Sequence, residues 1–282
     1  MALTPEVWPG QDDDSFLDVA GLGKSYARRQ GRHREVMHVL DDIHLEARRG
    51  QFITVIGPSG CGKSTLLSCI AGLTESDCGK ITVGGQEVRG PGFERAVVFQ
   101  QASLLPWRTI KRNVAYGLEL RRELSSSEIS ARADDVIELV RLTGFASHYP
   151  HEVSGGMQQR ANLARALAVD PALLLMDEPF GALDALTKEV LQDELSLLAT
   201  RMNRTTVFIT HDISEAVFLG DVVYVMSRRP GRIEARIPVP FERPRPRKVT
   251  ATPEFEAILA DLRQRLLGNA EKIIDFGSPG AE

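Results

Sequence analysis

A glycine-rich loop followed by a lysine and a serine constrains this chain more than any other feature. Residues Gly57–Thr65 read Gly-Pro-Ser-Gly-Cys-Gly-Lys-Ser-Thr and fit the pattern G-x-x-x-x-G-K-[ST]. A strand-like apolar run, Phe52–Ile56, precedes the loop and a helix-like run, Leu66–Ala71, follows it, which is the context that the pattern requires. Glycines let successive N–H groups face phosphate oxygens, and a helix N-terminus carries partial positive charge. The sequence therefore predicts a nucleotide-phosphate site.

Individual loop residues have distinct expected roles. Lys63 is expected to reach the β- and γ-phosphates, and the Ser64 hydroxyl is expected to bind Mg²⁺. Cys61 has two interpretations: either the helix N-terminus lowers its thiol pKa and makes it reactive, or it is a small residue that the loop tolerates. The nucleotide-binding candidates in the loop are Gly57, Pro58, Ser59, Gly60, Cys61, Gly62, Lys63, Ser64 and Thr65.

The composition is that of an ordinary globular protein and argues against several classes. The chain has 282 residues, of which 43% are hydrophobic and 26% charged, enough for one large or two small domains with a buried core. A net charge of -4 supplies no overall basic field, so no nucleic-acid partner is expected. No apolar run approaches the ~20 residues of a membrane span, so membrane contact is expected only through a partner. Three cysteines without metal-ligand spacing favour a reducing compartment.

The first hundred residues mix strands with the one phosphate-binding helix. Residues 1–14 are expected to form a disordered leader, and their acidic triplet Asp12–Asp14 without an apolar segment does not resemble a signal peptide. The basic run Arg28–Arg34 is interpreted as a solvated loop or, alternatively, as a phosphate or regulatory contact. Short strands are predicted at Phe16–Val19, Val36–Leu40, Ile43–Ala47, Ile81–Val83 and Ala96–Phe99.

The rest of the chain alternates between helices and strands. Residues 103–168 are helical in character, with N-cap chemistry at Ser125–Glu128, and are interpreted as an inserted helical subdomain. The apolar run Ala172–Met176 fits a central parallel strand, and further helices and strands follow up to Met226, which indicates a doubly wound α/β core. Residues 239–282 are interpreted as a basic, proline-rich linker and a helix. One apolar stripe of that helix is expected to dock on the domain, with partner contact as the alternative: Phe255, Ile258, Leu259, Leu262 and Leu266.

Two carboxylates follow the apolar strand that ends at Met176. Asp177 is expected to hold Mg²⁺, directly or through water, because a strand end facing a phosphate loop is a common place for a metal-binding carboxylate. Glu178 is expected to polarise the water that attacks the γ-phosphate. The alternative is an acidic pair that only caps the next turn.

A second glycine-containing turn, Ser154-Gly155-Gly156, opens another helix. Its first turn offers N–H groups to an anion, although such a turn alone is usually just a helix cap. A single nucleotide does not need two such sites from one polypeptide. We therefore expect the phosphate loop of one chain to face the Ser-Gly-Gly turn of another.

Together these residues resemble the ATP-binding cassette (ABC) family of transporter ATPases over nearly the whole chain. Gly57–Thr65 resembles the Walker A motif, Leu173–Glu178 the Walker B motif and Ser154–Arg160 the signature motif. The resemblance implies ATP and Mg²⁺ as ligands. It also implies an α/β fold, a P-loop NTPase (RecA-like) core with an N-terminal antiparallel β subdomain and an inserted α-helical subdomain, within residues 15–238.

The resemblance assigns roles to four further residues. Gln100 matches the Q-loop glutamine, which senses Mg²⁺ and faces the membrane partner, and His211 matches the switch histidine that contacts the γ-phosphate. Asp184 ends the stretch Phe180–Asp184, which matches the D-loop. Tyr26 stands where the family stacks an aromatic ring on adenine, and the alternative is a core tyrosine at a strand end.

The signature differs from the common Leu-Ser-Gly-Gly-Gln at two positions. Val153 replaces the leucine, and Met157 replaces the glutamine, which removes a polar side chain near the partner's nucleotide. The methionine resembles the nitrate/sulfonate/taurine branch of importers, as do the stretches Gln101–Trp107 and Ser227–Ile233.

The resemblance implies an ATPase subunit that powers an importer, with Glu178, His211 and Gln100 in catalysis. The expected partners are a second ATPase subunit forming a homodimer or a pair of paralogues, integral membrane permease subunits and, indirectly, a solute-binding protein. The expected location is the cytoplasmic face of the inner membrane. One alternative is a non-transport cassette ATPase, but neither a second cassette nor a long coiled-coil insertion is visible. The other is a soluble P-loop kinase or GTPase, against which Ser154–Arg160 and His211 argue.

Overall fold

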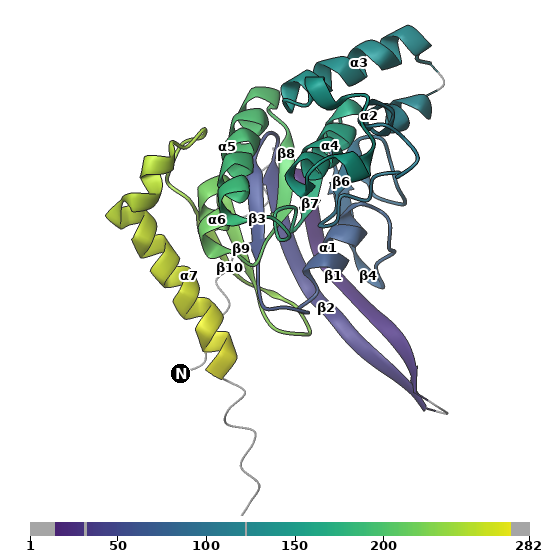
Figure 1. Ribbon diagram of the computed structural model, residues 1–282. Coiled ribbons are helices and arrows are strands. Elements are labelled where there is room, and N and C mark those ends of the chain that lie inside the picture. Colours follow the sequence, from purple (N-terminus) through teal and green to yellow (C-terminus); the bar gives the residue numbers. More distant parts are fainter. Residues whose placement is uncertain (1–14, 31–32, 122, 272–282) are drawn as a thin grey trace, which may run out of the picture.

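The computed structural model describes residues 15–30, 33–121 and 123–271 (Figure 1). The expected leader 1–14 lies outside the described residues, as do residues 31–32 of the basic run and residues 272–282. The described residues form a six-stranded sheet and a four-stranded sheet. Helices pack on both faces of the larger sheet, and the expected α/β fold class is confirmed.

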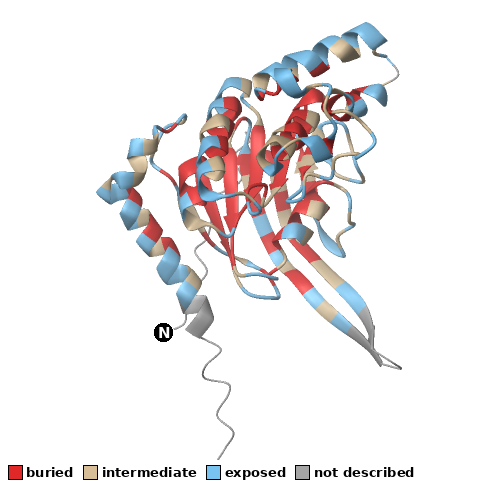
Figure 2. Ribbon diagram, in the orientation of Figure 1, coloured by how far each residue is buried: buried red, intermediate tan, exposed pale blue. Residues whose placement is uncertain are grey.

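The six-stranded sheet has the order β10-β9-β3-β8-β7-β6. All neighbouring strands are parallel except β10, which runs antiparallel to β9 at the edge. Every residue of β3, β8 and β9 is buried, because helices or the other sheet cover both faces (Figure 2). The strands are β3 (Phe52–Ile56), β6 (Arg95–Val98), β7 (Leu173–Asp177), β8 (Thr205–Ile209), β9 (Val222–Met226) and β10 (Ile233–Pro238).

The antiparallel sheet, of order β2-β1-β4-β5, differs from the sequence prediction in one respect. Its strands are β1 (Ser15–Gln30), β2 (His33–Arg48), β4 (Cys78–Val83) and β5 (Gln86–Glu87). The short strands expected at Phe16–Val19, Val36–Leu40 and Ile43–Ala47 are parts of one long hairpin. Its register shifts between Val19 and Leu22 interrupt the alternation of apolar residues, so the sequence pattern shows only fragments of each strand.

Helices on the two faces of the six-stranded sheet build two hydrophobic cores. One core joins the antiparallel sheet, α1 (Lys63–Ile70) and one face of the six-stranded sheet. The other core joins the opposite face to α5 (Ala185–Met202), α6 (Ile213–Leu219) and α7 (Pro253–Glu271). Cys61 of the phosphate-binding loop and the helix that follows it, α1, both belong to the first core. The loop therefore lies at the boundary between the two sheets.

The expected helical insertion forms its own core at one end of the molecule (Figure 1). Its helices are α2 (Ile110–Glu119), α3 (Ser126–Leu139) and α4 (Gly155–Ala168), with 3-10 turns at Thr143–Phe145 and Pro150–Glu152. Ser125 caps α3 in a reciprocal arrangement with Glu128, as its sequence suggests. Apolar residues of all three helices interdigitate there.

The C-terminal segment, residues 239–271, packs against the domain. Phe255, Leu259 and Leu262 of α7 are buried in the core cluster that contains α6, which confirms the expected docking of this stripe. The basic residues before α7 also make contacts. Arg245 is 4% exposed, and its guanidinium donates to the carbonyl oxygens of Val217 and Phe218, each at 2.8 Å. A 3-10 turn at Arg247–Ala251 leads into the helix.

Within the described ranges, none of the helices combines the length and apolar character that a membrane crossing demands.

Candidate nucleotide site

A cavity of about 400 Å³ opens at the carboxyl ends of the parallel strands β3, β6 and β7. Its volume falls in the range of roughly 300–1,000 Å³ that holds small ligands. Open α/β sheets bind ligands at this edge. The lining residues are Tyr26, Met37, Val39, Ser59, Gly60, Gly62, Lys63, Ser64, Thr65, Gln100, Asp177, Glu178 and Arg229. Candidates far apart in the sequence thus share one cavity.

Two loop glycines lie where a side chain would collide with a neighbouring strand. Gly62, directly before α1, has φ +113°, and a Cβ there would lie 2.8 Å from Leu40 Cδ2. A Cβ on Gly57 would lie 3.0 Å from the carbonyl oxygen of Met226. At Gly62 the positive φ and the close approach of β2 strongly favour glycine, and at Gly57 the close approach of β9 leaves little room for a side chain.

Lys63 folds back across the loop that precedes it. Its Nζ donates to the carbonyl oxygens of Gly57 at 2.8 Å and Pro58 at 3.1 Å, and the residue is 6% exposed. An ammonium group has three donors. The loop carbonyls thus hold the charge in place and leave it able to bind an anion.

Asp177 ends β7 and faces the first turn of α1. Burial raises the pKa of its carboxyl group, while a hydrogen bond with the Ser64 side chain and the charge of Lys63 partly offset this effect. Carboxylate and hydroxyl oxygens are the donors that Mg²⁺ prefers, with phosphate oxygens and water completing the shell. Asp177 and Ser64 therefore fit a magnesium ion that a nucleotide shares. In the described part of the chain, no group of three or more His, Cys, Asp or Glu could hold a metal.

Glu178 follows directly and lies against His211. Its φ of +43° is unusual for a non-glycine residue, and such a conformation costs about 1–3 kcal/mol. Its N–H donates to the Ile209 carbonyl at 2.9 Å, and its Oε2 lies 3.0 Å from His211 Nδ1. His211 is not part of the cavity lining but contacts Glu178, which is. A carboxylate held in this way can accept a proton from a water molecule in the cavity.

Gln100 and Tyr26 reach the cavity from β6 and β1. Gln100 is exposed just beyond the end of β6. Tyr26 is 39% exposed, and Lys24 Nζ lies 5.5 Å from the centroid of its ring. An exposed ring on the cavity wall is available for stacking. The alternative of a core tyrosine is therefore wrong.

The signature and D-loop residues lie outside this cavity. Ser154 is the N-cap of α4 and accepts from the Met157 N–H at 3.4 Å, while Gly155 is exposed with no atom near its would-be Cβ. Gly156 is half-buried, and a Cβ there would lie 2.7 Å from Thr187 Cγ2. Asp184 is likewise the N-cap of α5 and accepts from the Thr187 N–H at 3.0 Å, which lowers the pKa of its carboxyl group. Ser154 and Asp184 therefore act as helix N-caps within this chain.

Of the two interpretations of Cys61, the structure contradicts the reactive thiol and agrees with a small residue that the loop tolerates. Cys61 is 1% exposed, and burial raises the pKa of its thiol despite the nearby charge of Lys63. The Cys61 side chain points into the core cluster of the two sheets. The rise in pKa caused by desolvation is therefore larger than any lowering by the helix N-terminus.

Arg229 is a cavity residue that the sequence did not predict. Its guanidinium donates twice to the Gly60 carbonyl, at 3.1 and 2.7 Å, and thereby ties the β9–β10 connection to the phosphate loop. Met37 and Val39 of β2 also line the cavity. Arg229 lies in the stretch Ser227–Ile233, which resembles an importer branch. This resemblance is the sequence feature that could have drawn attention to Arg229.

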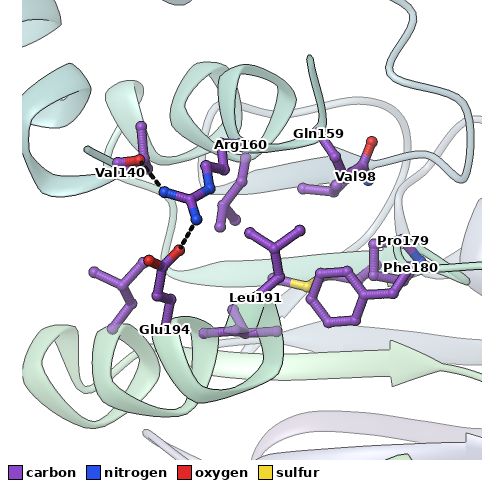
Figure 3. A pocket seen from close by; sticks show the side chains of 12 residues that line it. Val98, Val140, Gln159, Arg160, Pro179, Phe180, Leu191 and Glu194 are labelled. Atoms are coloured by element: carbon purple, nitrogen blue, oxygen red, sulfur yellow. Dashed lines mark hydrogen bonds and ion pairs between the residues drawn. The ribbon is translucent and has the colours of Figure 1, made fainter. Parts of the chain in front are cut away.

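A second cavity lies between helix α4 of the insertion and helix α5 (Figure 3). It measures about 20 Å³ and is lined mostly by apolar side chains, of which α5 supplies Leu191, Leu195 and Leu198. At its edge Arg160 Nη2 lies 3.3 Å from Glu194 Oε2 (Figure 3). A space of this size holds about one water molecule, so it is not a nucleotide site.

Comparisons with known proteins identify the family. The family described as ABC transporter matches residues 40–181. The chain is 50% identical over 231 residues to an uncharacterised ABC transporter ATP-binding protein of Methanocaldococcus jannaschii, covering 82% of this chain and 85% of that protein. It is 44% identical over 238 residues to the aliphatic sulfonates import ATP-binding protein of Bacillus subtilis, covering 84% and 89%. It is 45% identical over 253 residues to the taurine import ATP-binding protein of Rhizobium johnstonii, covering 88% and 95%.

Solved structures show the same fold. A dimeric post-hydrolysis state of an ATP-binding cassette bound to ADP and Pi matches with a TM-score of 0.70 and 30% identity, covering 80% of this chain and 100% of that chain. A Clostridium perfringens protein that is part of an ABC transporter complex matches with a TM-score of 0.71 and 23% identity, covering 93% and 100%. With a cavity that joins a phosphate loop to Asp177 and Glu178, this chain belongs to the ABC transporter family, as one of its ATP-hydrolysing cassettes.

Proposed function

We propose that this chain is the ATP-binding and ATP-hydrolysing subunit of an importer for a small solute, an anion of the nitrate/sulfonate/taurine type. The observation that carries the ATPase site is the shared cavity of the phosphate loop, Asp177 and Glu178, with His211 3.0 Å from Glu178. Two relatives that cover most of this chain bear the names of sulfonate and taurine import proteins. These names support import and the class of solute.

The proposed roles follow from where each residue stands in the cavity. The phosphate loop Gly57–Thr65 binds the phosphates of ATP, with Lys63 on the β- and γ-phosphates and Tyr26 stacked on adenine. Ser64 and Asp177 hold Mg²⁺ with help from Gln100. Bound there, the ion supplies charge neutralisation at the phosphate oxygens. Glu178 polarises the attacking water, and His211 orients Glu178 and contacts the γ-phosphate.

A second chain is proposed to complete each site. Ser154 and Gly155 are exposed and lie outside their own chain's cavity. Through Ser154, Gly155 and Gly156 the helix N-terminus of α4 can therefore serve the nucleotide held by a partner, with Asp184 beside it. The dimeric cassette with ADP and Pi supports this arrangement. A homodimer is the simplest form.

The region after β6 is proposed to contact membrane-embedded permease subunits. Trp107 is 72% exposed and Phe99 is 40% exposed, and aromatic side chains are enriched at the centres of protein interfaces. The carbonyl oxygen of Phe99 accepts from Gln159 Nε2 at 3.4 Å and from Asn162 Nδ2 at 3.2 Å, both on α4. Gln100, the next residue, lines the cavity. A partner at this surface would thus reach both the signature helix and the nucleotide, at the cytoplasmic face of the inner membrane. A solute-binding protein would act indirectly.

Three experiments test the proposal. Lys63→Ala should weaken ATP binding about 10- to 100-fold, since it removes charge-assisted hydrogen bonds to phosphate. Unchanged ATP affinity would refute the proposed nucleotide site. Co-purification of the tagged full chain with a polytopic membrane protein would support transport. Association with ribosomes or DNA instead would favour a non-transport cassette.

The solute class is tested by calorimetry on the solute-binding protein of the same complex. Nitrate, taurine and an aliphatic sulfonate are the ligands, and binding of none of the three would refute the proposed solute class.

A further inference from the structure

Buried polar side chains surround the loop that carries His211. Thr210 is 2% exposed, and its hydroxyl is hydrogen-bonded to the carboxyl group of Glu215. The same hydroxyl accepts from the Asp212 N–H at 3.0 Å, and Asp212 Oδ1 accepts from the Glu215 N–H at 3.2 Å. Because Thr210 and Asp212 flank His211, these bonds set the backbone from which the histidine projects.

Helix α5 holds Glu215 in turn. The Glu215 residue is 4% exposed, accepts from Gln192 Nε2 at 2.9 Å and lies 3.6 Å from Lys188 Nζ. Lys188 also pairs with Asp212 at 2.7 Å. A buried carboxyl group is costly unless it is paired and hydrogen-bonded. The position of Glu215 therefore depends on these partners.

Arg247 connects this cluster to the C-terminal segment. Its Nη1 donates to Gln192 Oε1 at 3.0 Å, and its Nη2 pairs with Asp193 at 2.9 Å. Gln192 thus meets Arg247 through its amide oxygen and Glu215 through its amide nitrogen. Rotating the amide by half a turn would break both bonds. The orientation of the Gln192 amide therefore links Arg247 of the C-terminal segment to Glu215, which contacts the His211 loop.

We propose that Arg247 and Gln192 are positioning residues through which the docked C-terminal segment sets the orientation of His211 and the rate of ATP hydrolysis. This inference rests on the proposed role of His211. Neither residue lines the nucleotide cavity, so the effect falls on kcat and leaves ATP affinity unchanged. Phe255, Leu259 and Arg245 anchor the segment separately. The Arg247 contact can therefore be removed while the segment stays docked.

The test is a double-mutant cycle on steady-state ATP hydrolysis by the full chain. Arg247→Ala and Gln192→Ala should each lower kcat about 3- to 30-fold, with the KM for ATP unchanged. The double variant should be no slower than the slower single variant, because the two residues act in one chain of contacts. Arg247→Lys keeps a charge beside Asp193 but loses the fork geometry, and should behave like Arg247→Ala.

Asp193→Asn is the matched control, since it removes the charge of an Arg247 partner that lies outside the chain of contacts. It should leave kcat unchanged. Thermal melts and ATP-binding stoichiometry give the folded fraction, and kcat is expressed per bound nucleotide. Additive losses in the double variant would overturn the proposal, as would an Asp193→Asn loss equal to that of Arg247→Ala, or a wild-type kcat in Arg247→Ala.

His211→Ala separates this inference from the proposed function. Wild-type turnover in His211→Ala would refute the proposed role of His211 and, with it, this inference. Loss of turnover in His211→Ala together with wild-type kcat in Arg247→Ala would refute the positioning role alone.

Discussion

His211 Nδ1 lies 3.0 Å from Glu178 Oε2, where two neighbouring parallel strands end. The pairing of β7 with β8 places Asp177 opposite Ile209, so a carboxyl group and an imidazole that are 33 residues apart meet at one edge of the sheet. Because a carboxylate only accepts hydrogen bonds, this contact assigns the imidazole proton to Nδ1. Nε2 is then left for a second partner.

Glu178→Gln should lower ATP turnover about 10²- to 10⁴-fold, because the amide keeps the shape of the side chain but cannot act as a base. ATP binding should persist, and an ATP-bound dimer should accumulate. Phosphate release and light scattering with ATP measure these outcomes. Glu254→Gln, at an exposed position on α7, is the control. Full turnover in Glu178→Gln would contradict the assignment.

Asp177→Asn should stabilise the nucleotide-free protein at neutral pH. Burial raises the pKa of Asp177, so the folded state binds this proton more tightly than the unfolded state does. The ionised carboxylate therefore lowers the free energy of unfolding above its ordinary pKa. Thermal melts without Mg²⁺ should show Tm raised by about 2 °C at neutral pH. The difference should shrink as the pH falls toward about 4, and Mg²⁺-dependent turnover should be lost. An unchanged Tm at neutral pH would count against this account.

Gly62→Ala should lower the free energy of unfolding by about 2–4 kcal/mol, since it combines a left-handed φ with a collision against Leu40. Gly85 also has a positive φ, +78°, but its would-be Cβ has no atom within 4 Å. Gly85→Ala should therefore cost only about 1 kcal/mol. Urea unfolding compares the two, and equal losses would show that the collision with β2 is unimportant.

Cys78 should be the fast-reacting thiol of the native protein. It is exposed, whereas Cys61 and Cys69 are buried, and burial raises the pKa of Cys69 to about 11. A thiol reagent should modify Cys61 and Cys69 only as the protein unfolds. Cys78→Ser should remove the fast phase of the reaction. A fast phase that remains in this variant and is blocked by ATP would show that Cys61 is a reactive thiol.

Local patterns predicted the strands of the parallel sheet and the capping of α3 well, because each depends on a few consecutive residues. They failed for β1 and β2, where register shifts break the alternation of apolar residues. The same limit applies to Cys61. Its position before a helix suggested a reactive thiol, but the packing of β2 and β9 around the loop buries it.

The sequence by itself determined the phosphate loop, the acidic strand end at Asp177 and Glu178, and the family, because these reside in contiguous residues. Only the tertiary structure decided that Tyr26, Arg229 and Glu178 share one cavity. It alone also showed that Arg247 reaches the His211 loop through Gln192 and Glu215. Such contacts depend on which strands are neighbours and how helices pack on them, and this information is spread over the whole chain.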